Sequence, residues 1–334
     1  MSDVRTDTAS VVDRIRPVSA GGPVVAVHFL GETPVFVLGE EALAFAPRDA
    51  AVRTVSVHGG AILAAAADAS RIVTGGDDSK VMATDAAGTV TNIATDAKRR
   101  WIDRVAAGSD GAVAWAAGKQ AFVRTGKQEQ RVCEVPSSVG GLAFAPKGFR
   151  LAIAHYNGAL LWFPNAQAAP ERLEWKGSHL GVTFSPDGRF LVTAMQEPTL
   201  HGWRLVDSKH MRMSGYAAKV RSMSWSAGGK WLATSGSDQL ILWPFQAKDG
   251  PMGKSPQLLA PAGHKVGIVA CHPKQDVVAV GYEDGLLLLV RIDDGAEIIA
   301  KRAGTAAVAA VAWSADGSML AFGCEDGEAG VIEL

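Results

Sequence analysis

Basic and aromatic residues alternate in four short segments of this chain, and residues of these types are suited to binding another protein. Arg, Trp and Tyr dominate the energetics of protein interfaces because each combines a large contact area with a polar group. The segments begin at Lys98, Trp175, Tyr216 and Gly263. The residues expected to contact a partner are Arg100, Trp101, Arg104, Trp175, His179, Tyr216, Lys219, Arg221 and Lys265.

The sequence gives weaker evidence for a catalytic or metal-binding site than for this binding surface. The run Gly253-Lys254-Ser255 resembles the end of a phosphate-binding loop, but that motif requires glycine at the position of Lys248. The three cysteines lack the CxxC spacing of a zinc site or a disulfide framework. No GxSxG or HExxH motif occurs. We therefore expect no catalytic residue, no metal and no cofactor, and we expect Cys133, Cys271 and Cys324 to be buried, reduced thiols.

The elements that position these residues repeat along the chain. A short apolar run, a tight turn, a second run, an acidic turn and a third run recur eight times, at intervals of 37 to 46 residues. Asp, Gly and Pro in the turns are typical of strand connections, and the short apolar runs are typical of strands. A period near 40 residues indicates a propeller or another repeat array. We predict four strands per unit, the outer strand first.

Several residues at matching positions of these units complete the pattern. A Gly-His pair precedes an innermost strand, a Thr lies on a second strand, an Asp lies in the following turn, and a Trp closes a third strand. These residues are Gly263 and His264; Thr193 and Thr234; Asp238 and Asp284; and Trp162, Trp203 and Trp243. In these features the chain resembles the WD40-repeat family, although no single unit holds all four. The resemblance implies an all-β, single β-propeller and a scaffold or adaptor role.

The repeat count sets the expected domain organisation. Residues 12–334 are predicted to form one propeller of eight four-stranded blades, with seven as the alternative, after a disordered tail at 1–11. Innermost strands are expected to begin near residues 24, 61, 102, 139, 179, 220, 266 and 307. The run Val12–Val18 is expected to pair into the C-terminal blade and close the propeller, which removes exposed strand edges.

Two interpretations of the basic and aromatic segments remain open. In a propeller these segments share one rim with the acidic turns, so the cations either bind a partner or simply balance nearby carboxylates. Exposed ion pairs contribute only about 0 to 1 kcal/mol and do not indicate a function. The segment Lys98–Arg104 favours a docking site, because its own unit has Gly118-Lys119-Gln120 in place of an acidic turn. Lys147 and Arg189 are expected at the opposite rim.

Composition limits the class of partner. The net charge of −1 and the pI of about 6.7 do not favour a general binder of nucleic acids or anionic membranes. We expect a non-catalytic, cytoplasmic, monomeric scaffold that binds a protein or peptide, possibly an acidic one, and no membrane. A hydrolase or lactonase with a metal in the channel is one alternative, although innermost strands that begin at Val24, Val139, Val220 and Val266 offer few ligands. An RNA-associated propeller that uses Lys98–Arg104 is the other.

Overall fold

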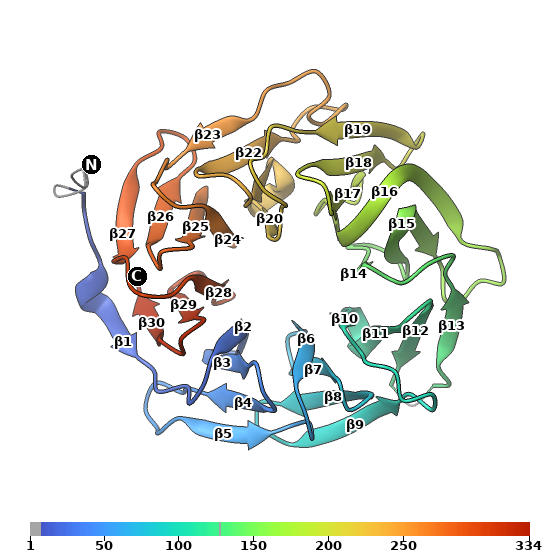
Figure 1. The fold of residues 1–334 in the computed structure, drawn as a ribbon, viewed down its shortest axis with the longest axis horizontal. Coiled ribbons are helices and arrows are strands. Elements are labelled where there is room, and N and C mark those ends of the chain that lie inside the picture. Colours follow the sequence, from blue (N-terminus) through green and yellow to red (C-terminus); the bar gives the residue numbers. More distant parts are fainter. Residues whose placement is uncertain (1–7, 127) are drawn as a thin grey trace. The chain divides into compact units, whose positions relative to one another are not determined.

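The computed structural model describes residues 8–126 and 128–334, which are built almost entirely from antiparallel strands (Figure 1). Helical structure in these residues is limited to three 3-10 turns, and no helix in them could cross a membrane. The chain divides into two compact units, each described by itself: Met1–Phe36, Ala46–Val52 and Arg221–Leu334 form the first, and Val37–Phe45 and Arg53–Val220 form the second. The 3-10 turns are η1 (Val12–Arg14), η2 (Ser109–Gly111) and η3 (Ala227–Gly229).

In the first unit, three sheets have four antiparallel strands each. Two of them keep chain order, so consecutive strands form hairpins. The strands of these two are β20 (Met223–Trp225), β21 (Trp231–Thr234), β22 (Leu240–Pro244) and β23 (Gln257–Leu259), then β24 (Val266–Cys271), β25 (Val277–Tyr282), β26 (Leu287–Arg291) and β27 (Glu297–Lys301). The third has the order β1-β30-β29-β28 and contains β1 (Ile15–Pro17), β28 (Val308–Trp313), β29 (Met319–Cys324) and β30 (Ala329–Glu333).

The N-terminal strand completes the last of these sheets, as the sequence predicts. In the pairing of β1 with β30, Ile15 is opposite Ile332 and Pro17 is opposite Gly330. Of the predicted tail, residues 1–7 lie outside the described residues. The backbone of Ala9 and Val11 exchanges hydrogen bonds with Ile299 at 2.8 and 3.0 Å.

The second unit contains two four-stranded sheets and one six-stranded sheet, all antiparallel and in chain order. The first two comprise β6 (Ile62–Ala67), β7 (Arg71–Gly76), β8 (Lys80–Asp85) and β9 (Val90–Thr95), and β10 (Arg104–Ala107), β11 (Ala112–Ala117), β12 (Gln120–Thr125) and β13 (Arg131–Glu134). The third comprises β14 (Gly141–Phe144), β15 (Leu151–Trp162), β16 (Glu171–Phe184), β17 (Phe190–Met195), β18 (Leu200–Arg204) and β19 (Lys209–Met213). One further sheet has the order β2 (Val24–Leu30), β3 (Thr33–Leu38), β4 (Ala42–Phe45) and β5 (Arg53–Ser56).

The described residues thus form seven sheets, which is the number predicted as the alternative. The expectation of eight blades in eight separate sheets is wrong. The reason lies in β16, a single strand of 14 residues. Its residues 171–174 pair with β15 as an outer strand, and its residues 179–184 pair with β17 as an innermost strand. The units predicted to begin near residues 139 and 179 therefore share one sheet.

Turns between innermost and second strands form as their residue types require. In one of them, Asp187 accepts hydrogen bonds from the Ser185 hydroxyl at 2.6 Å and the Arg189 amide at 3.0 Å, and Gly188 has a φ of +76°. Asp316 accepts the equivalent bonds from Ser314 and Ser318, at 2.6 and 3.0 Å. These local bonds fix where each hairpin turns and so set the register of its strands.

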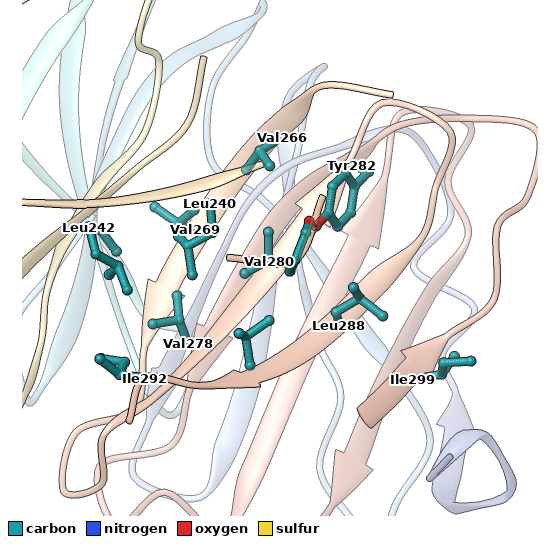
Figure 2. Packing of buried hydrophobic residues seen from close by; sticks show 13 residues of the cluster. Leu240, Leu242, Val266, Val269, Val278, Val280, Tyr282, Leu288, Ile292 and Ile299 are labelled. Carbon is teal, nitrogen blue, oxygen red and sulfur yellow. Dashed lines mark hydrogen bonds between the residues drawn. The ribbon is translucent and has the colours of Figure 1, made fainter. Parts of the chain in front are cut away.

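Apolar residues of consecutive sheets pack against one another to form the core. In the first unit, Leu240 and Leu242 of β22 belong to one cluster with Val278 and Val280 of β25 and Leu288 of β26 (Figure 2). Second and third strands are buried along nearly their whole length, so they read as continuous apolar runs. The packed sheets hold the connecting loops at fixed positions.

Candidate functional site

Two of the segments expected to bind a partner, Lys98–Arg104 and the one that begins at Trp175, lie on either side of Gly140 in the second unit. Arg104 Nε donates a hydrogen bond to the Gly140 carbonyl oxygen at 2.7 Å. A Cβ atom added to Gly140 would lie only 1.9 Å from the carbonyl oxygen of His179. The residues leading into β10, β14 and the second half of β16 therefore lie side by side.

Two cations of the Lys98–Arg104 segment, Arg100 and Arg104, have local partners, so for these two the expectation that they lack them is wrong. Arg100 Nη2 lies 2.6 Å from Asp96 Oδ1, and its Nη1 donates to the Ala117 carbonyl oxygen at 2.9 Å. Arg104 pairs with Asp103 at 3.3 Å. Hydrogen bonds from Arg100 lower the pKa of Asp96 despite the opposing effect of burial. The sequence interpretation missed Asp96 because it considered only the turn that follows the segment.

Trp101 is an exposed aromatic residue of this segment that could anchor a partner. Its relative exposure is 66%, and it lies between the paired Arg100 and the fully buried Ile102. Asp96 Oδ2 accepts hydrogen bonds from the backbone amides of Lys98 and Arg100, at 3.1 and 3.0 Å. The loop therefore has a fixed shape and holds the indole ring of Trp101 in solvent.

Trp175 and His179 serve different purposes. The ring of Trp175 stacks on His201, with centroids 4.0 Å apart, and remains partly exposed. His179 is buried and unavailable to a partner, contrary to expectation. Its Nε2–H donates to the Trp175 carbonyl oxygen at 3.0 Å, and its Nδ1 lies 2.7 Å from the Thr193 hydroxyl. Burial lowers the pKa of His179, so the ring is neutral near pH 7 and holds Trp175 in place.

The remaining expected docking residues differ in burial. Tyr216 is buried, so it is a poor surface anchor, whereas Lys219 is half-buried. Arg221 and Lys265 are exposed and belong to the first unit, while the other seven belong to the second.

A pocket of about 650 Å³ lies beside Trp175 in the second unit. We call it the Tyr156 pocket, because Tyr156 is an exposed large side chain in its wall, with a relative exposure of 54%. Asn157 and Gly158, with φ angles of +71° and +141°, form the adjacent bend in β15. The lining residues are Pro136, His155, Tyr156, Asn157, Ala159, Leu160, Arg172, Leu173, Glu174, Trp175 and Lys176.

The Tyr156 pocket combines aromatic walls with charge. Arg172 and Lys176 supply two cations and Glu174 one anion. His155 Nδ1–H donates to the Tyr156 carbonyl oxygen at 2.7 Å, and burial lowers the pKa of His155. Its ring is therefore neutral near pH 7, with Nε2 as a hydrogen-bond acceptor. No sequence motif indicated this pocket.

The residues expected to match the repeat family are mostly in structural positions. Thr193 and Thr234 are fully buried, and their hydroxyls donate to the carbonyl oxygens of His201 and Ile241 at 3.0 and 3.1 Å. His264 is exposed. Trp162, Trp203 and Trp243 are buried, while Asp238 and Asp284 accept hydrogen bonds from Ser237 and the Leu286 amide.

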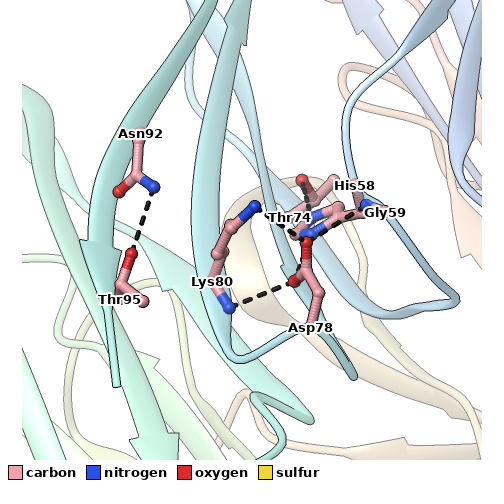
Figure 3. A network of polar contacts seen from close by, with 7 residues as sticks. All are labelled: His58, Gly59, Thr74, Asp78, Lys80, Asn92 and Thr95. Carbon is pink, nitrogen blue, oxygen red and sulfur yellow. Dashed lines mark hydrogen bonds and ion pairs between the residues drawn. The ribbon is translucent and has the colours of Figure 1, made fainter. Parts of the chain in front are cut away.

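A network of polar side chains that the sequence analysis did not predict surrounds His58 (Figure 3). Buried His58 lies between Asp78 Oδ1 and the Thr74 hydroxyl, 2.9 Å from each. Asp78 also accepts the Gly59 amide at 3.2 Å and lies 3.7 Å from Lys80 Nζ. Burial acts to raise the pKa of Asp78, but these hydrogen bonds and the His58 ring lower it overall. A His followed after 16 residues by Thr and after 20 by Asp was the available signal.

One cluster has donor atoms suited to a metal ion. Donor atoms of Cys324, Asp326 and Glu328 lie within 4.8 Å of one another. Lys301 Nζ, however, lies 2.9 Å from Glu328 Oε2 and already supplies a positive charge there. Burial raises the pKa of the Cys324 thiol to about 11, so it is protonated near pH 7 and a poor metal ligand.

Comparisons with known proteins agree with this description. The family model "WD domain, G-beta repeat" matches residues 208–243, and the model "Anaphase-promoting complex subunit 4 WD40 domain" matches residues 269–334. The meiotic recombination protein rec14 of Schizosaccharomyces pombe is 29% identical over 112 residues, which cover 32% of this chain and only 36% of that relative. The computationally designed Ika8 protein superposes over 95% of this chain and 99% of its own, with a TM-score of 0.75 and 15% identity. That likeness shows the fold, an all-β single β-propeller of four-stranded blades.

Proposed function

This chain belongs to the WD40-repeat family, and on that premise we propose that it is a non-catalytic scaffold that binds a partner protein through loops of its second unit. The family is generally non-enzymatic, and its propellers typically bind other proteins. We further propose that the protein acts in the cytoplasm as a monomer and binds neither membranes nor nucleic acids.

The observation that carries this proposal is the exposure of Trp101 on a loop of fixed shape. A large apolar side chain costs free energy while it remains in water, and an interface gains that free energy back. A preorganised loop loses little conformational entropy when it binds. Trp101 therefore has the properties of an interface anchor.

Partner binding by the Trp101→Ala variant tests the proposal. Proteins captured by the purified chain are identified, and the affinity of the main one is measured with wild type and variant. Loss of an anchor residue costs about 2 kcal/mol or more, so the affinity should fall by roughly 30-fold. Lys147→Ala, in a turn between an innermost and a second strand, is the control and should leave the affinity unchanged. Equal effects of the two substitutions would place the interface elsewhere.

The RNA-associated alternative makes a different prediction. Two of the four cations in its basic segment are neutralised, since Arg100 and Arg104 pair with Asp96 and Asp103. Affinity for RNA that falls steeply with salt would support that alternative against the protein scaffold.

A further inference from the structure

We propose that the Tyr156 pocket is a specificity pocket for an extended segment of the partner, and that it takes one Asp or Glu side chain together with a neighbouring apolar side chain. The inference rests on the proposed scaffold function and goes beyond it, because it defines the chemistry of what is bound. It follows from the charges, the aromatic walls and the rigidity of the pocket.

Charge indicates an anionic ligand. Within residues 8–126 and 128–334, Arg172 and Lys176 form no ion pair, although both line the pocket. Arg172 is close enough to His155 to disfavour a proton on that ring. A carboxylate placed near the two cations would gain charge-assisted hydrogen bonds with them.

The number of charges favours a carboxylate over a phosphate. Two cations and Glu174 give the lining a net charge of +1, which one carboxylate balances. A phosphorylated side chain carries about −1.5 to −2 at pH 7, and its excess charge would face Glu174. The neutral Nε2 of His155 adds an acceptor, to which a backbone amide of a bound peptide can donate.

Aromatic and aliphatic side chains supply the second half of the pocket. The exposed Tyr156, the partly exposed Trp175, and the residues Pro136 and Leu160 line it. A volume of about 650 Å³ exceeds what one carboxylate side chain fills, so there is room for an apolar neighbour. Pockets of roughly 300 to 1,000 Å³ are the usual size for specific ligands.

The wall that contains Trp175 is rigid. Its indole stacks on buried His201, and its carbonyl oxygen accepts the hydrogen bond from His179. Tyr156 is held through its backbone amide, which donates to the Ser137 hydroxyl at 2.8 Å. Asn157 Oδ1 accepts from the Gly177 amide at 3.2 Å, which connects the two sides of the pocket. A preformed pocket selects its ligand by fit, because it does not rearrange.

Peptide selection on the purified chain tests the inference without a known partner. A library of random peptides is enriched on wild type and depleted on an Arg172→Gln/Lys176→Gln double variant. Both residues are exposed, so the double variant should fold, and circular dichroism and melting verify that. We expect enriched peptides to share one Asp or Glu beside an apolar residue. Replacing that acid by its amide should weaken binding at least tenfold.

Synthetic versions of an enriched peptide separate the possible outcomes. Tighter binding when phosphoserine replaces the acid would overturn the carboxylate assignment, and so would failure to enrich any acidic peptide. Lys147→Gln is the control for a general loss of positive charge and should not affect binding. If the partner protein depends on Trp101 but not on Arg172 or Lys176, the scaffold function stands and this inference fails. If acidic peptides bind the pocket but Trp101→Ala leaves partner affinity unchanged, this inference stands and the proposed interface at Trp101 fails.

Discussion

The His58 network allows a stability prediction that can be worked from the structure. His58 Nδ1 lies 2.9 Å from Asp78 Oδ1, so Nε2 is the remaining polar atom of the ring, and it forms a hydrogen bond of 2.9 Å with the Thr74 hydroxyl. Thr74→Val keeps the shape of the side chain and removes that partner. Both residues are buried, so water cannot replace the lost bond.

The expected cost is that of an unsatisfied buried polar atom, about 1 to 3 kcal/mol. Unfolding entropy is about 2.1 cal/mol/K per residue, or roughly 0.7 kcal/mol/K for this chain of 334 residues unfolding in one transition. The melting temperature should therefore fall by about 1.5 to 4 °C. Differential scanning calorimetry and urea titration both measure this change.

Two comparisons make the result specific. Thr91→Val, on exposed β9, removes a hydroxyl that contacts water and should be nearly neutral. In a His58→Phe background the Nε2 atom is gone, so Thr74→Val should cost much less than in wild type. Equal costs in both backgrounds would refute the view that the hydrogen bond between His58 and Thr74 stabilises the fold.

Three further outcomes are expected. Burial lowers the pKa of His201 to about 3, so the free energy of unfolding should be highest above pH 6.5 and should decrease between pH 6.5 and 3, where the unfolded chain takes up a proton on His201 and the folded chain does not. In urea titrations, the free energy of unfolding of His201→Phe should depend less on pH over this range. Deleting residues up to Pro17 removes β1 and should lower the melting temperature, and an unchanged melting curve would show that the pairing with β30 contributes nothing. Burial raises the pKa values of the thiols of Cys133, Cys271 and Cys324 to about 11, 12 and 11, so their alkylation should be slow at pH 8 until urea unfolds the chain. Replacing all three cysteines by Ala or Ser should cost about 1 to 3 kcal/mol of folding stability in total, and partner binding should stay intact.

The sequence predicted those features that depend on neighbouring residues. Turns such as Ser185–Gly188 form through hydrogen bonds within a few residues, so residue types alone indicate them. The repeat spacing then located the strands and indicated that the N-terminal run would pair with the last unit. The pairing of Arg100 with Asp96 was equally local and could have been predicted from their spacing of four residues.

Features that depend on distant residues could not be predicted in the same way. The segment around His179 has the composition of a surface loop, but the ring of His179 is buried, where it contacts the Thr193 hydroxyl and the Trp175 carbonyl oxygen. The Tyr156 pocket requires Pro136, His155 and Arg172 to come together from separate strands and loops. No local pattern distinguishes such residues from those that simply face solvent.

The continuity of β16 has a consequence for how this chain can be rearranged. Circular permutation and domain insertion succeed where a flexible loop can be opened without loss of backbone hydrogen bonds. Between Glu174 and His179 the chain passes directly from an outer to an innermost strand, so a new terminus there would interrupt β16 itself (Figure 1). An insertion or deletion of one residue would also turn the side chains of one half to the wrong face. We expect permuted chains to fold when they begin in the loop between β22 and β23, and not when they begin within β16.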